Sequence, residues 1–148
     1  MLKWILIGIF SFTVAVGAGL YFFKGNSGGG TATEIDWRLM SELDYLNNKP
    51  TEKLQKAHNT RVKIPGFMVP LEDNQRKVTE FLLVPSPQAC IHVPAPPPNQ
   101  MVYVRMKNGV PAAYGPIWVY GEFKISTQKS QYGEASFELS ADFVEDYR

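Results

Sequence analysis

The chain has 148 residues, 45% of them hydrophobic and 13% aromatic, which is enough apolar material for one folded domain and excludes a fully disordered protein. Fifteen Lys and Arg oppose fourteen Asp and Glu, so the net charge of +1 gives no overall attraction to nucleic acid, and we expect no nucleic-acid partner. The single cysteine excludes a disulfide within the chain.

The N-terminal segment Trp4-Phe23 carries no charge over twenty positions and has a lysine at each flank. As a helix it would be about 30 Å long, which is the thickness of the hydrocarbon core of a bilayer. Aromatic residues at both ends match the interfacial positions that Trp and Tyr prefer. We therefore predict a signal anchor or transmembrane helix within residues 1–24. The alternative is a signal peptide that is cleaved near the small residues Val16-Gly17-Ala18.

Charge at the two flanks favours one orientation of this segment. The α-amine and Lys3 lie on one side, and Lys24 lies on the other. This small excess favours a cytoplasmic N-terminus by the positive-inside rule. We predict a single-pass protein of the inner membrane with its body in the periplasm; secretion to the periplasm after signal cleavage is the alternative.

The segment that follows, residues 25–32, is rich in Gly and is predicted to be a flexible linker to a soluble β-rich domain at residues 33–148. A helix is predicted to begin at Thr33, as N-cap, and to present an apolar stripe at helical spacing. A second, short helix is predicted from Thr51 to Asn59. The stripe of the first helix consists of Leu39, Leu43 and Leu46.

Beyond Arg61 the apolar residues alternate with a period of two, which predicts strands. The five predicted strands are Arg61 to Leu71, Lys77 to Val84, Met101 to Met106, Ile117 to Ile125 and Glu134 to Phe143. Pro65-Gly66, expected at a sheet edge, and Gly121 resemble the bends that barrels use to turn corners. Lys107-Asn108-Gly109 is predicted to be a turn. We predict a mainly β protein with N-terminal helices, built as a small five-stranded OB-like barrel; an open α+β sheet is the alternative.

Cys90 and His92 stand two positions apart, so in an extended chain their side chains share one face. Thiolate and imidazole are soft-metal ligands, and the pair is therefore the predicted metal site, with zinc as the expected cofactor. Zinc takes three or four protein ligands, and His58, Asp73 and Glu80 are candidates for the remainder. The alternative is that Cys90 is a buried apolar residue.

The prolines that follow predict a stiff polyproline II segment. Either this segment binds an aromatic groove on a partner, or it only carries the chain from one strand to the next, which is the simpler interpretation. The amides of Asn99 and Gln100 are expected to tie the loop to neighbouring backbone. The candidate partner-binding residues are Pro94, Pro96, Pro97, Pro98, Asn99 and Gln100.

Catalytic motifs give little support for an enzyme. The sequence contains no His-Glu-x-x-His and no Cys-x-x-Cys, and its Gly28-Gly29-Gly30 run lies in the linker rather than between a strand and a helix. We therefore expect no enzymatic activity and no catalytic residue. Thiol chemistry at Cys90 is the remaining enzymatic alternative, and it would require a depressed thiol pKa.

Several stretches of the body resemble the bacterial domain of unknown function 3299 family. They are Val62 to Leu71, Val78 to Pro85, Ala89 to Gln100 and Pro116 to Gly121. The most specific of them is Cys-x-His followed by prolines and Asn-Gln; Gln88 and Ala95 depart from the family pattern. The resemblance covers Trp37 to Tyr147. It implies an exported or membrane-anchored protein and makes Cys90 and His92 a candidate site.

Two functions are therefore expected. The first is a membrane-anchored periplasmic accessory protein that binds zinc or another soft metal through Cys90 and His92 and assists a transporter. The alternative is a non-catalytic protein–protein interaction module of a membrane transport complex, which uses the proline-rich loop.

Overall fold

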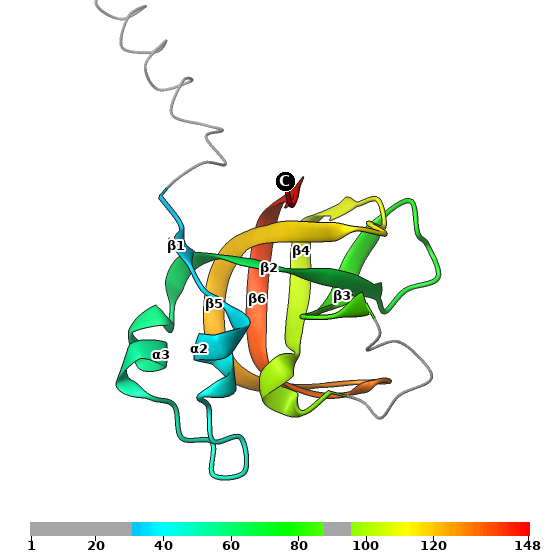
Figure 1. The fold of residues 1–148 in the computed structure, drawn as a ribbon. Coiled ribbons are helices and arrows are strands. Elements are labelled where there is room, and N and C mark those ends of the chain that lie inside the picture. Colours follow the sequence, from blue (N-terminus) through cyan, green and yellow to red (C-terminus); the bar gives the residue numbers. More distant parts are fainter. Residues whose placement is uncertain (1–30, 88–95) are drawn as a thin grey trace, which may run out of the picture. The chain divides into compact units, whose positions relative to one another are not determined.

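The computed structural model of this protein describes residues 31–87 and 96–148, where the chain is mainly β sheet with few helices (Figure 1). The elements in chain order are β1 (Thr33–Glu34), α2 (Trp37–Ser41), α3 (Glu52–Ala57), β2 (Thr60–Pro70), β3 (Val78–Val84), the 3-10 turn η2 (Pro98–Gln100), β4 (Val102–Val110), β5 (Pro116–Ser130) and β6 (Gly133–Asp146). The predicted anchor at 1–24 and most of the predicted linker lie outside the described residues. Within the described ranges, no helix has the length and apolar character needed to cross a membrane.

The first predicted helix begins later than expected. Thr33 lies in β1, which pairs in parallel with β2, and the side chain of Asp36 accepts a hydrogen bond of 2.8 Å from the Leu39 amide as the true N-cap. The helix ends at Ser41, so Leu46 is exposed rather than part of its apolar stripe. The second helix is confirmed as α3, with Thr51 as its N-cap. The strand forms here in place of a helix because its pairing with β2 brings the next residue, Ile35, into the core: the Ile35 amide donates a 3.0 Å hydrogen bond to the Lys63 carbonyl, and the residue is only 1% exposed.

The long strands pair in a ring. β2 pairs antiparallel with both β3 and β5. β3 also pairs antiparallel with β4, and β5 with β6, whereas β4 and β6 run parallel. The pairings therefore begin and end at β2, as the curved strands of Figure 1 illustrate. β1 is a sixth strand that the sequence did not predict.

The Pro65-Gly66 bend lies where β2 changes partners: β2 is not an edge strand, but Pro65 and Gly66 themselves pair on one side only, with β5. Residues 60–67 of β2 pair with β5, and residues 67–70 pair with β3. Close packing explains the glycine, since a Cβ at position 66 would lie 2.7 Å from the backbone oxygen of Val84. The Pro65 carbonyl at the bend accepts a 2.6 Å hydrogen bond from the Trp37 indole.

The later strands are longer than predicted. β4 continues through Lys107-Asn108-Gly109, which is therefore not a turn, and reaches Val110, which pairs with Val78. β5 and β6 extend to a tight connection at residues 131–132. Gly121 does mark an irregularity, as predicted, because the β5–β6 register shifts between Tyr120 and Gly121.

The main core fills the space between the strands, and α2 and α3 add Met40 and Leu54 to it. Phe123 and Phe137 pack there with their ring centroids 5.3 Å apart. Burial of each such side chain stabilises the fold by about 1.5–3 kcal/mol before entropy is counted. Other strand residues that are fully buried in this core are Val62, Ile64, Val78, Phe81, Leu83, Val102, Val104, Val119 and Leu139.

Candidate functional site

β3 is apolar on both faces, and its second face forms the floor of the candidate site. Phe81 and Leu83 point into the main core, whereas Leu82 and Val84 belong to a separate apolar cluster. The alternation of side chains along β3 predicts this division for residues 81–84. It fails at Val78, because the register with β4 shifts between Val78 and Glu80 and the Val78 side chain therefore lies in the main core. The remaining buried members of the second cluster are Met101, Tyr103 and Ala135, with Phe67, Val69 and Leu71 packed against them.

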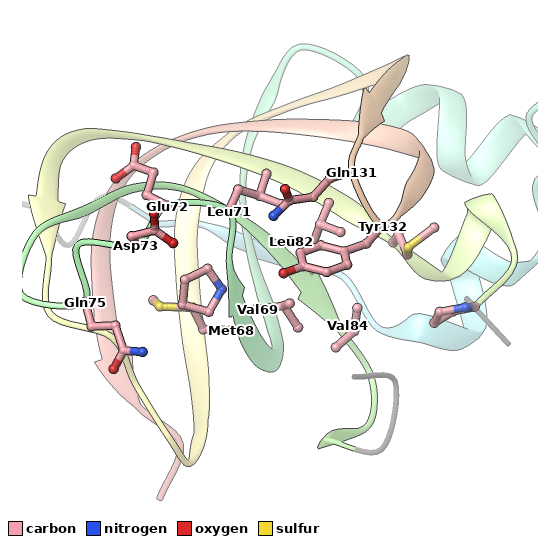
Figure 2. A pocket seen from close by; sticks show the side chains of 13 residues that line it. Met68, Val69, Leu71, Glu72, Asp73, Gln75, Leu82, Val84, Gln131 and Tyr132 are labelled. Atoms are coloured by element: carbon pink, nitrogen blue, oxygen red, sulfur yellow. The ribbon is translucent and has the colours of Figure 1, made fainter. Parts of the chain in front are cut away.

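A pocket of about 380 Å³ opens on this second cluster. Its sides come from two connections that are far apart in the sequence, the 71–77 loop between β2 and β3 and the turn at 131–132 between β5 and β6. The described residues that line it are Met68, Val69, Pro70, Leu71, Glu72, Asp73, Gln75, Leu82, Val84, Pro96, Met101, Gln131 and Tyr132. In Figure 2, Glu72, Asp73 and Gln75 lie at one end, and Gln131 and Tyr132 lie away from them, beside the aliphatic side chains of Leu71, Val69, Leu82 and Val84.

The carboxylate of Glu72 is held in place at the first end of the pocket. It accepts hydrogen bonds from the hydroxyl and the backbone amide of Thr79, and the amide bond is 3.2 Å long. These two bonds, the hydroxyl first, lower the pKa of Glu72 below its ordinary value. Glu72 therefore carries its negative charge at neutral pH. Asp73 beside it is exposed to solvent.

The proline segment meets this pocket at its described end. Pro96 lines the pocket, and η2 begins two residues later, after Pro97 as its N-cap. Asn99 ties the segment to the body as expected: it is 8% exposed, and its side-chain amide donates to the carbonyls of Ser41 and Leu43 at 3.1 Å each. Cys90, His92 and Pro94 lie outside the described residues.

The three candidates for further metal ligands do not come together. The Nδ1 of His58 accepts a 3.0 Å hydrogen bond from the Ile125 amide, and Glu80 forms an ion pair with Arg105 at 3.3 Å. Asp73 lines the pocket. Among residues 31–87 and 96–148, no group of three His, Cys, Asp or Glu side chains is arranged to hold a metal ion.

Sequence reasoning missed most of the pocket. Its floor has a local signal, because both faces of β3 are apolar although one face of a solvent-exposed strand should be polar. Its two ends carry no such signal. Residues 71–75 and 131–132 become neighbours only through the pairing of their strands.

Comparison with known proteins identifies the family. The family model described as "Protein of unknown function (DUF3299)" matches residues 37–146. A crystal structure of a DUF3299 family protein from Pseudomonas aeruginosa PAO1 is 33% identical in sequence, with a TM-score of 0.65, and the match covers 80% of this chain and 98% of that chain. No curated protein matches significantly. The resemblance expected from the sequence is thus confirmed, and the chain belongs to the DUF3299 family.

Proposed function

We propose that this protein is a non-catalytic binding module, anchored in the inner membrane with its body in the periplasm, and that the pocket on the second apolar cluster is its binding site. The anchor is supported by the uncharged run Trp4-Phe23. Signal cleavage and release into the periplasm remain the alternative. The partner on this proposal is a protein of a membrane transport complex.

We also propose that the body is an OB-like barrel rather than an open sheet. Support comes from the ring of pairings that begins and ends at β2, and from the parallel pairing of β4 with β6, the third and fifth long strands. OB folds bind ligands on the face of their second and third strands, between the loops that follow the first and the fourth. The corresponding connections here are 71–77 and 131–132, and both line the pocket.

The chemistry of the pocket favours binding over catalysis. Its described walls combine aliphatic and methionine side chains with a few polar groups at the ends, which is the usual composition of a ligand site. Glu72 is already engaged by Thr79, so its carboxylate is a fixed charge rather than a free base. This pocket, placed between the two connections, is the observation that carries the proposal.

Site-specific photocrosslinking in cells tests it. A benzophenone amino acid replaces Tyr132 at the pocket or Tyr45 in the α2–α3 connection; the two tyrosines are 44% and 41% exposed, so position 45 is a matched control. We expect a discrete adduct with another protein from position 132 and none from position 45. Equal labelling at the two positions, or no adduct at 132, would contradict the proposed site.

A second proposed function is that Cys90 and His92 bind zinc or another soft metal, in a protein that assists a transporter. The support is the Cys-x-His spacing of the sequence and its position shortly before Pro96, which lines the pocket. The full chain, purified in detergent without chelator, should contain stoichiometric metal that is lost in Cys90→Ser. The control Asp146→Asn removes an exposed carboxylate at the end of β6 that is not among the candidate ligands, and it should keep the metal. Metal-free wild-type protein would refute this function.

A further inference from the structure

The pocket joins an apolar floor to a negatively charged end, and from this combination we infer that its occupant is an extended segment of another protein in which an aliphatic side chain stands next to a Lys or Arg. This inference names the chemistry of the partner and rests on the binding function proposed above. Three features of the pocket lead to it: its size, its charge and its hydrogen-bonding groups.

The size and the floor select an aliphatic group. Val69, Leu82 and Val84 present branched aliphatic surface near Tyr132, away from the acidic end of the pocket (Figure 2). A volume of about 380 Å³ is near the lower limit of about 300–1,000 Å³ for ligand sites. The pocket therefore suits one or two side chains of a longer segment. Met68 and Met101 in its wall can adjust to the shape of the side chain that enters.

The charge selects a basic neighbour for that group. Glu72 and Asp73 are the charged members of the described lining, and both are negative. Arg76 and Lys77 belong to the same loop but do not line the pocket. Two carboxylates at one end repel phosphates, anionic lipid headgroups and fatty acids, and they attract a cationic side chain. The fixed geometry of Glu72 limits the entropy lost when such a side chain binds.

The remaining polar groups suit a peptide backbone. Gln75 lies at the acidic end, where its side-chain oxygen accepts a 2.8 Å hydrogen bond from the Tyr114 hydroxyl and its side-chain nitrogen can donate to a ligand. Gln131 lies away from that end (Figure 2), and its amide can both donate and accept hydrogen bonds. A peptide bond offers the matching donor and acceptor. A glycan would favour a broader aromatic platform, whereas Tyr132 is the one aromatic side chain among the described lining residues.

Selection from a random peptide library tests the inference. The full chain in nanodiscs is the bait, a phage library of random dodecapeptides is the probe, and the Tyr132→Ala protein is used for counter-selection. We expect enriched peptides to carry Leu, Ile, Val or Met next to Lys or Arg. A synthetic copy of the best peptide should bind Tyr132→Ala more than tenfold more weakly, and the matched control Tyr45→Ala as well as wild type.

Charge is tested separately. Asp73 is an exposed loop residue, so Asp73→Asn should fold normally and weaken the peptide by about two- to fivefold at low salt, with a smaller effect at high salt. Asp146→Asn removes another exposed carboxylate, at the end of β6, and should have no effect. Thermal unfolding of each variant checks that the fold is retained.

The outcomes separate the inference from the function on which it depends. Tyr132-dependent peptides that are acidic, or that show no preference for a basic residue, would overturn the inference and leave the binding site standing. Failure to select any Tyr132-dependent peptide would overturn the inference, and the binding function would then be decided by the crosslink at position 132. A crosslink at 132 that joins two copies of this chain would also overturn the inference, because the occupant would then be a second copy.

Discussion

Substitution of Gly121 by alanine should destabilise the fold strongly, because β5 pairs with a strand on each side at this position. It pairs with Val62 of β2 on one side and with Ala141 of β6 on the other. A Cβ at position 121 would lie 2.7 Å from the Cα of Ala141 and still closer to the backbone oxygen of Ser140. Both obstacles are backbone atoms, so no side-chain rotation relieves the contact.

The geometry sets the size of the effect. An ordinary contact begins at 3.4 Å, so β5 and β6 must separate by roughly 0.7 Å at Ala141, and by more at Ser140. β5 cannot move away from β6, because it is hydrogen-bonded to β2 on its other side. Overpacking of a well-packed site lowers the free energy of unfolding by about 1–3 kcal/mol. Because Gly121 has strands on both sides, we expect a loss near ~3 kcal/mol. For a body of this length that lowers Tm by about 10 °C.

Denaturant unfolding of Gly121→Ala, followed by tryptophan fluorescence, measures this cost. Gly115→Ala is the control, because a Cβ at position 115 would meet no atom within 4 Å and the residue does not have a positive φ. We expect Gly115→Ala to be neutral, or more stable by up to about 1 kcal/mol. The reasoning is refuted if Gly121→Ala unfolds within about 0.5 kcal/mol of the wild type, or if Gly115→Ala is destabilised equally.

Two further predictions concern single polar contacts. Asn99→Ala should lower the free energy of unfolding by about 1–3 kcal/mol, because the carbonyls of Ser41 and Leu43 lose their donor. Asn99→Asp should lower it further, because its carboxylate would face both carbonyl oxygens. Urea unfolding of the two variants checks this order. Hydrogen bonds from Arg61, at 2.7 and 2.9 Å, lower the pKa of Asp142. Its contribution to stability is therefore present above the unfolded-state pKa of about 4 and is lost as the pH falls through the lower folded-state pKa. Asp142→Asn should be less stable at neutral pH and lose less stability than wild type on acidification below about pH 4, in unfolding curves measured across that range; an unchanged acid slope would argue against this role.

The strands illustrate what local pattern can and cannot predict. Alternation in β3 correctly separates Phe81 and Leu83 from Leu82 and Val84, because side chains of any extended segment alternate. It places Val78 on the wrong face, because the register shift depends on the neighbouring strand β4.

The same limit explains the false turn at Lys107-Asn108-Gly109. Turn residues predict a reversal, yet the segment stays extended because Val110 finds a partner in Val78. The glycine there makes room for two neighbouring side chains: a Cβ at position 109 would contact the side chain of Lys77 and lie 3.3 Å from that of Thr79. A glycine needed for close packing looks the same in a sequence as a glycine needed for a turn.

Family membership and the β character of the body follow from the amino-acid sequence alone, because motifs and the period of two are properties of neighbouring residues. Tertiary structure decided that β2 pairs with both β3 and β5, and that residues 71–75 and 131–132 enclose one pocket. The physical reason is that strands of similar apolar pattern are interchangeable partners until the whole core is packed. Only the assembled sheet determines which loops face each other and where their charges lie.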